Sequence, residues 1–536
     1  MTKNILFIMC DQLRFDYLSC YGHPHLHTPN IDALAARGVK FENAYVQSPI
    51  CGPSRMSYYT GRYVRSHGST WNGTPLRIGE PTLGDHLKEI GVRNVLLGKT
   101  HMRADIEGLK KLGIDPNSEI GIFNSQCGFE VYERDDGLHP DKHHGPGPLY
   151  NKYLNDNGFD GDNPWQSWAN SAQSDSGELL SGWLMQNADK PARIPDYFSE
   201  TPYLTRRAMQ FIDEADDTPW CLHLSYIKPH WPYMAPAPYH NMYSEQHITP
   251  LNRTEQERET AHPLHKAYMD HFVSKTFSRE DTRGKVIPTY MGLIKQIDDQ
   301  MGILFDHLQK SGKADDTMIV FTADHGDYLG DHWMGEKELF HEESVKVPLI
   351  IYNPDTSADA TRGTTSTELV EAIDLAPTFV EYMGGQPKYN VLEGRSLLAL
   401  IAGDKQRLRQ YAFSEYDYSM RKASTTLQVD IADARMIMVR DERYKFTYVQ
   451  GMRPMLYDLQ QDPKEQHDLA LDEAYSEHCN RFESALTQWA LKHHNRITIS
   501  DQQINNNRGK EVNSGILIGY WDQQELNQAQ LKGTDL

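Results

Sequence analysis

The sequence lacks three features: a long uninterrupted apolar segment, cysteines at C-x-x-C spacing, and an excess of basic residues. The absence of a long apolar segment excludes a membrane-spanning helix. The net charge of −20 excludes the basic surface that nucleic acids and anionic membranes require. We therefore expect no nucleic-acid partner and no membrane partner, so an anionic substrate must be met by a local group of cations.

Signals for secretion are also absent. Residues 1–11 hold an apolar run that is shorter than a secretory core and lacks a small-residue cleavage site. The six cysteines are scattered along the chain, and without a leader we expect them to be reduced thiols. The sequence thus predicts a cytoplasmic protein.

Four apolar runs predict the fold class. They lie at residues 5–10, 94–97, 220–226 and 318–321, and each ends in polar side chains. Buried parallel strands have such continuous apolar runs, and ligands bind at their carboxyl ends. A core-facing helix is predicted by apolar residues at helical spacing, namely Tyr290, Ile294, Ile297, Met301, Leu304 and Leu308. We expect an α/β fold with a large, mostly parallel sheet.

The length of 536 residues predicts two domains. We place the larger at residues 1–404 and the smaller, of α+β type, at residues 405–536, where shorter strands are expected at 434–439, 444–449 and 456–459. The Gln- and Asn-rich residues 500–536 form either an oligomerisation arm or a mobile end.

Residues 135–195 have weak periodicity and predict long loops. His139, His143 and His144 lie there. They could bind zinc, but a solvated loop is favoured because no other ligand spacing accompanies them.

The most informative segment is Cys51-Gly52-Pro53-Ser54-Arg55. Pro53 suits the first turn of a helix, and Gly61 is placed to end it. Cys51 would then lie at a helix N-terminus, where free amides and the helix dipole favour an anion. By itself, this short motif fits a buried cysteine beside a proline turn as well as a catalytic site.

Oxygen-rich pairs follow two of the predicted strands. Asp11 and Gln12 follow the first strand, and Asp324 and His325 follow a later one. Both pairs could face one divalent cation, with residue 51 as a further ligand. A single Asp after a strand is more often a helix cap or a turn former, so the interpretation depends on the pairs occurring together with Cys51.

With these motifs in this order, the chain resembles the type I sulfatases of the alkaline phosphatase superfamily over nearly its whole length. The resemblance implies an alkaline phosphatase-like sheet between helices, beside a smaller C-terminal domain. It also implies that a formylglycine-generating maturation enzyme converts Cys51 to formylglycine. One hydroxyl of the hydrated aldehyde would attack sulfur, and the other would expel the anion.

The resemblance also implies roles for the pocket residues. Arg55 would stabilise the diol, and Gly98-Lys99-Thr100-His101 resembles the motif whose lysine holds a sulfate oxygen and whose histidine assists the diol. Without the resemblance to this family, Lys99 and His101 would be interpreted as polar residues at the surface end of a strand.

Three further residues match positions in the family's pocket. His230, with a pKa near neutrality, would protonate the leaving oxygen. Lys337 would contact the ester oxygens, although most lysines are solvated surface charges. Asn72 would add a pocket amide, as in the related phosphonate monoester hydrolases.

Two positions depart from the commonest sulfatase pattern. Gln12 stands where a second Asp is usual, and His325 where Asn is frequent. They make the cation site less anionic and slightly softer, which makes manganese a rival to calcium, the expected ion. Both positions resemble the phosphonate monoester hydrolases, whereas Lys99 and His101 favour a sulfate ester because those hydrolases have Tyr and Thr instead.

Three hypotheses follow. The first is hydrolysis of small-molecule or saccharide sulfate monoesters, the second is hydrolysis of phosphonate monoesters or phosphodiesters, and the third is non-catalytic anion binding by a Cys51 thiol. Related cytoplasmic proteins predict a homo-oligomer. Candidates for lining the leaving-group pocket are Trp165, Trp168, Trp183, Glu415, Tyr416 and Tyr418.

Overall fold

A computed structural model describes residues 3–141, 148–404, 406–508 and 515–532. Its main feature is an eight-stranded sheet with the order β10-β2-β9-β8-β1-β7-β3-β4. The strands are β1 Asn4–Asp11, β2 Val39–Tyr45, β3 Arg93–Gly98, β4 Glu130–Arg134, β7 Trp220–Pro229, β8 Thr317–Ala323, β9 Leu349–Tyr352 and β10 Thr364–Glu371. Only β9 runs antiparallel to its neighbours β2 and β8. The predicted mostly parallel α/β sheet is confirmed.

The four predicted apolar runs form four adjacent strands, β8, β1, β7 and β3. All their pairings are parallel. Every residue of β1, β7 and β8 is buried, which explains why these runs are apolar without alternation. Because the strands are parallel and adjacent, the polar residues that follow them come to one edge of the sheet.

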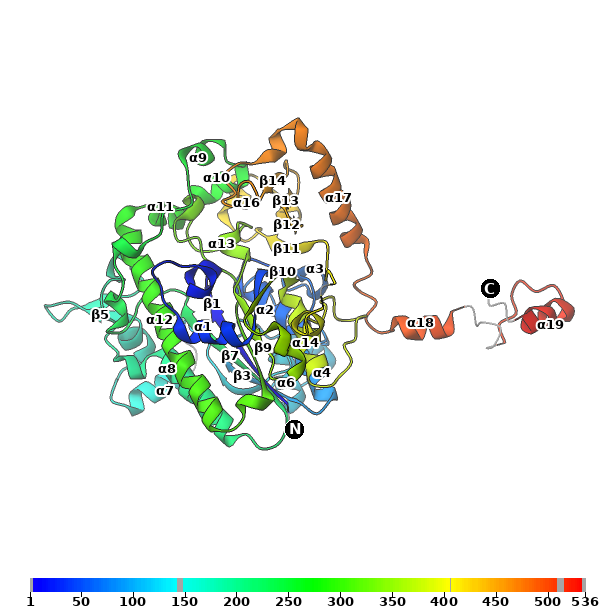
Figure 1. The fold of residues 1–536 in the computed structure, drawn as a ribbon, viewed down its shortest axis with the longest axis horizontal. Coiled ribbons are helices and arrows are strands. Elements are labelled where there is room, and N and C mark those ends of the chain that lie inside the picture. The colour runs from blue at the N-terminus through cyan, green and yellow to red at the C-terminus, as the bar shows by residue number, and fades with distance from the viewer. Residues whose placement is uncertain (1–2, 142–147, 405, 509–514, 533–536) are drawn as a thin grey trace.

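Helices cover both faces of this sheet (Figure 1). One side carries α1 (Pro29–Arg37), α8 (Glu200–Glu214) and α12 (Glu280–Lys310), and the other carries α2 (Cys51–Thr60), α4 (Leu83–Glu89) and α14 (Leu375–Tyr382). The residues predicted to face the core from a helix are all buried in α12, namely Tyr290, Ile294, Ile297, Met301, Leu304 and Leu308. None of the helices within the described ranges is both long and apolar enough to cross a bilayer.

A four-stranded antiparallel sheet follows, in the order β11-β12-β13-β14. Its strands are β11 Ala412–Asp417, β12 Arg435–Arg440, β13 Tyr444–Val449 and β14 Met455–Asp458. The last three lie close to the predicted strands, whereas β11 was not predicted. Helix α17 (Ser476–Leu491) packs on this sheet through a buried cluster that includes Phe446, Phe482 and Trp489. The predicted boundary after residue 404 remains a prediction, and residue 405 lies outside the described residues.

The predicted loop region holds α7 (Leu149–Asp156) and two short strands, β5 (Ser171–Gln173) and β6 (Leu179–Ser181). His139 Nε2 lies 2.7 Å from Asp135 Oδ1, whereas His143 and His144 lie outside the described residues. At the C-terminus, α18 (Asp501–Asn507) and α19 (Gln523–Lys532) extend away from the body of the molecule (Figure 1).

Candidate active site

Helix α2 begins at Cys51 and is followed by Gly61, whose φ of 64° gives the left-handed C-cap, as the motif predicts. All its residues are buried. The Ser54 hydroxyl donates to the Asp324 carbonyl at 2.6 Å, and the Tyr58 hydroxyl donates to the Ala323 carbonyl at 2.9 Å. These bonds hold α2 against the end of β8, so that Cys51 lies at the carboxyl edge of the sheet.

The polar residues that follow the central strands meet around Cys51. Asp11 ends β1, Lys99 follows β3, His230 follows β7, and Asp324 and His325 follow β8. Gly98 permits this close approach: its φ is 103°, and a Cβ there would lie 2.1 Å from the Ser225 carbonyl oxygen. The glycine of the Gly98-Lys99 pair is therefore required by the packing of β3 against β7.

A set of possible cation ligands consists of Asp11, Cys51, Asp324 and His325, whose ligand atoms all lie within 4.8 Å of one another. Cys51 Sγ is 3.0 Å from His325 Nε2. His325 Nδ1 donates to the Gly326 carbonyl at 2.9 Å, which leaves Nε2 as the ligand atom facing the site. Carboxylate oxygens and an imidazole nitrogen are suitable donors for a divalent cation, so the residues fit the predicted metal.

Gln12 is oriented by two residues that the sequence analysis missed. Its amide nitrogen donates to the Asp327 carboxylate and to the Tyr233 hydroxyl at 3.4 Å. Its Oε1 therefore faces the site and accepts a bond from Lys337 Nζ at 3.1 Å. The second aspartate in Asp324-His325-Gly326-Asp327 was the available signal for this support.

Arg55 holds the two carboxylates in place. Its Nε donates to Asp324 Oδ2 at 2.8 Å, and its Nη2 donates to Asp11 Oδ2 at 3.1 Å. Its Nη1 donates to the Lys99 carbonyl at 2.8 Å. The guanidinium thus orients the cation ligands, and its predicted bond to a diol at position 51 remains a prediction.

Cations surround the Cys51 sulfur. Lys337 Nζ lies 3.2 Å from Sγ, and Lys99 Nζ lies 2.5 Å from Asp11 Oδ2. Burial by itself raises the pKa of the Cys51 thiol, but Lys337, His325 and Lys99, with a hydrogen bond from His101, lower it well below its usual value. The site therefore stabilises negative charge at position 51, as an oxyanion would require.

His230 differs from its predicted protonation state. Its Nδ1 donates to the Trp231 carbonyl at 2.6 Å, so Nε2 faces Lys337 Nζ at 3.2 Å. Burial and the charge of Lys337 lower the pKa of His230 to about 3. The expectation of a pKa near neutrality is therefore wrong for the free protein, because the sequence could not show how completely this imidazole is buried.

Asn72 lies at the N-terminus of α2, where its Oδ1 accepts a bond from Gly52 N at 2.7 Å. Among the candidates for the leaving-group pocket, Trp183 packs edge-on against Trp231 at 5.8 Å, and Tyr416 stacks on Trp71 at 6.1 Å. Trp183 and Tyr416 therefore support Trp231 and Trp71, which are adjacent in sequence to His230 and Asn72.

The other pocket candidates make different contacts. Trp165 Nε1 donates to Glu200 at 2.8 Å, and Trp168 packs under the Arg193 guanidinium. Glu415 accepts a bond from the Arg65 backbone, and Tyr418 packs against Tyr416.

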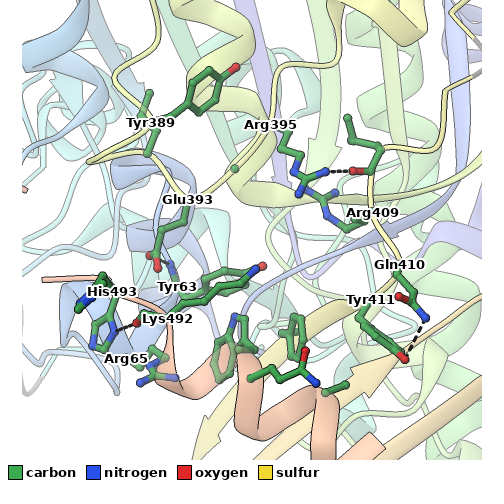
Figure 2. Close-up of a pocket in the computed structure, with 18 of the residues that line it drawn as sticks. Tyr63, Arg65, Tyr389, Glu393, Arg395, Arg409, Gln410, Tyr411, Lys492 and His493 are labelled. Atoms are coloured by element: carbon green, nitrogen blue, oxygen red, sulfur yellow. Dashed lines mark hydrogen bonds between the residues drawn. The ribbon is translucent and has the colours of Figure 1, made fainter. Parts of the chain in front are cut away.

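A cavity of about 920 Å³ lies near the opposite end of α2. Figure 2 shows Tyr63, Arg65, Glu393 and Arg395 among its lining residues. None of the predicted catalytic or cation-binding residues is among the residues that line it. The large cavity and the reactive cluster are therefore separate places in the molecule.

Comparisons with known proteins agree with the fold. A sequence model of the sulfatase family matches residues 3–385, and one for the N-sulphoglucosamine sulphohydrolase C-terminal region matches residues 330–492. The chain is 31% identical to the multifunctional alkaline phosphatase superfamily protein PehA of Trinickia caryophylli, over 92% of this chain and 96% of that protein.

Two further similarities concern an arylsulfatase and a solved structure. The arylsulfatase of Clostridium perfringens is 26% identical, over 89% of this chain and 92% of that protein. The structure of a phosphonate monoester hydrolase from Silicibacter pomeroyi has a TM-score of 0.79 and 27% identity, covering 94% of this chain and 96% of that one.

Proposed function

The chain belongs to the sulfatase family and is a sulfuric ester hydrolase, and we propose that it cleaves sulfate monoesters at position 51. The observation that carries this proposal is the convergence of Lys99, Lys337 and His230 on Cys51 at the N-terminus of α2. A sulfate group has several anionic oxygens, so it requires cations on more than one side of the attacked atom.

We propose that one divalent cation is held by Asp11, Gln12, Asp324, His325 and residue 51. The donor set supports calcium, with manganese as the alternative because one donor is an imidazole. A bound cation would lower the pKa of a hydroxyl at position 51 and neutralise charge on the sulfate oxygens. Arg55 contributes by keeping both carboxylates aimed at the same point.

Cys51 is proposed to be the precursor of formylglycine, formed by a maturation enzyme. Its hydrate would supply one hydroxyl for attack and another for release of sulfate. A thiol at this position is already shifted toward its anion by the neighbouring cations, and the same cations would favour an ionised hydroxyl. Mass spectrometry of the peptide containing Cys51 tests the conversion, because the aldehyde has a different mass from the thiol.

The pocket residues are then assigned as follows. Lys99 and Lys337 hold the sulfate oxygens, and His101 takes a proton from the second hydroxyl. His230 is neutral in the free protein because of burial and Lys337. The negative charge of a bound substrate opposes the effect of Lys337, so His230 can take up the proton that it delivers to the leaving oxygen. Asn72 provides a neighbouring amide.

A second candidate is hydrolysis of phosphonate monoesters or phosphodiesters. The similarity to a phosphonate monoester hydrolase structure and the Gln12 and His325 positions favour it. Lys99 and His101 favour sulfate. Family membership argues against the third hypothesis, a protein that only binds anions.

The test compares kcat/KM for nitrophenyl sulfate and nitrophenyl phenylphosphonate, using protein produced with a formylglycine-generating enzyme and Cys51→Ala as the control. A sulfate preference that disappears in Cys51→Ala supports the proposal. A phosphonate preference would contradict it and would make Gln12 and His325 the better guides to the substrate.

The remaining proposals concern the substrate, the assembly and the location. We propose a small-molecule or saccharide sulfate ester as substrate, a division into domains at 1–404 and 405–536, and a cytoplasmic location. A homo-oligomer is supported by the C-terminal tail, where Ile518 and Trp521 are 87% and 88% exposed and offer an apolar surface to a second copy. Light scattering of the full chain tests the assembly, and cell fractionation tests the location.

A further inference from the structure

The loop of residues 329–339, called the presenting loop below, has an unusual backbone. Six of its non-glycine residues have positive φ, between 46° and 87°. They are Leu329, His332, Trp333, Glu336, Glu338 and Leu339. Residues other than glycine rarely adopt this conformation, and it persists only where the surrounding structure imposes it. The presenting loop must therefore be held by strong contacts.

Lys337 lies within the presenting loop and reaches three groups of the active site. Its Nζ is 3.2 Å from Cys51 Sγ, 3.1 Å from Gln12 Oε1 and 3.2 Å from His230 Nε2. Backbone bonds fix the residues on either side: Tyr328 N donates to the Glu336 carbonyl, and Glu338 N donates to the Pro49 carbonyl. The position of this ammonium thus depends on the conformation of the loop.

The first anchor of the presenting loop, called the histidine anchor, is built on His332. Its Nδ1 lies 2.5 Å from Glu257 Oε1 in α9 (Glu255–Thr260), and its Nε2 lies 3.3 Å from Glu343 Oε2 in α13 (Glu342–Val345). Burial by itself lowers the pKa of His332, but Glu343 and Glu257 raise it well above its usual value. The anchor is therefore an imidazolium held between two carboxylates.

The second anchor, called the arginine anchor, pairs Glu338 with the Arg421 guanidinium. Glu338 directly follows Lys337 and is 4% exposed, while Arg421 comes from the region of the small sheet. The Arg421 guanidinium also lies 5.1 Å from the centre of the Trp71 ring. Trp71 precedes Asn72, which binds the first turn of α2, so this anchor connects the presenting loop to the helix that carries Cys51.

We propose that the histidine anchor and the arginine anchor position Lys337 for the reaction, so that Glu257, His332, Glu343, Glu338 and Arg421 are positioning residues. The proposal rests on the proposed function in one respect, since it takes Lys337 to contact the ester. Without an anchor, the loop can relax toward ordinary backbone angles and carry the ammonium away. A displacement of 1 Å is enough to lower a rate by about 100-fold.

Two variants and their matched controls test this. Arg421→Gln and Glu257→Gln each remove one charged partner of an anchor. Arg443→Gln removes an exposed arginine that pairs with the buried Asp458, away from the presenting loop, and Glu259→Gln changes an exposed residue of the same helix as Glu257. We expect kcat/KM to fall by about 10- to 100-fold in the anchor variants and to stay within about twofold in the controls. Arg421→Lys should restore part of the loss.

The decisive measurement repeats both anchor variants in a Lys337→Ala background. If the anchors act through Lys337, their effect on kcat/KM should shrink there to less than about threefold. An equal loss in both backgrounds would overturn the proposal, and so would a Lys337→Ala variant as active as the wild type. Melting temperatures of all variants separate positioning from unfolding.

This cycle can be run with whichever ester the protein hydrolyses best. A phosphonate preference would therefore contradict the proposed function without affecting the test of the anchors. As a readout independent of activity, hydrogen exchange of amides 329–339 should become faster in the anchor variants than in the controls. Unchanged exchange in both anchor variants would contradict the proposal.

Discussion

Two buried clusters of charge can be compared, one around Cys51 and one around His332. Both contain a set of side chains that could hold a cation, and around His332 this set is Glu257, His332 and His341. In the histidine anchor, one imidazolium lies between Glu257 and Glu343, so the charges neutralise one another. Around Cys51, cations and cation ligands converge on one sulfur at a helix N-terminus. A reactive site is thus distinguished by groups that point at a shared position, rather than by buried charge alone.

The largest difference between the two clusters should appear when the Cys51 side chain is removed. Cys51→Ala is expected to lower kcat/KM for the preferred ester by at least about 1,000-fold, because no other group can replace the nucleophile. Cys20→Ala is the matched control, since that thiol lies outside the cluster. Activity in Cys51→Ala above one tenth of wild type would mean that the nucleophile lies elsewhere.

The second-largest difference between the two clusters should be in cation binding. We expect one divalent ion per chain by elemental analysis, with chelation lowering kcat/KM by about 100-fold or more and calcium or manganese restoring it. Asp324→Asn should lower the ion content, whereas Glu257→Gln should leave it unchanged. Two ions per chain, or loss of the ion in Glu257→Gln, would give the His332 cluster the role assigned to the Cys51 cluster.

The His332 cluster should instead affect stability with a defined pH dependence. The pKa of His332 is raised in the folded state, so its stabilisation is complete below the unfolded value of about 6.5 and decreases as pH rises through the folded value. Glu257→Gln should lower the free energy of unfolding by about 3 kcal/mol at acidic to neutral pH and by less at higher pH. Urea titrations at pH 6 and pH 9 measure this, and an equal loss at both would contradict it.

The smallest effect is expected in the cavity of Figure 2. Arg395→Gln changes a cation on its lining but touches neither charge cluster. We expect kcat/KM within about twofold of wild type and a change in unfolding free energy within about 0.5 kcal/mol. A tenfold loss of activity would show that this cavity communicates with the site.

Much of the fold was predictable because strands and helices that are buried require apolar residues at regular positions in the sequence. The apolar runs of β1, β3, β7 and β8 lack alternation because both faces of the sheet are covered. Helix α2 was bounded by its own residues, with Pro53 in its first turn and Gly61 at its C-cap. Such features depend on the backbone preferences of single residues, which do not require contacts with distant parts of the chain.

The site was only partly predictable, since motif order suggested which residues meet but not how they interact. The orienting pair Asp327 and Tyr233 and the arginine anchor join residues that are distant in the sequence. The bonds of Arg55 to both carboxylates and the lowered pKa of His230 depend on neighbours brought by other strands. No local pattern records such neighbours.

By itself, the sequence determined the apolar strands, the helix that begins at Cys51 and the set of polar residues available at the strand ends. Only the tertiary structure decided which of these residues touch. The physical reason is that charge interactions and desolvation depend on distance and burial, and both are set by the adjacent packing of β8, β1, β7 and β3. The presenting loop then made Lys337 a neighbour of Cys51, and helices α9 and α13 enclosed His332 between two carboxylates.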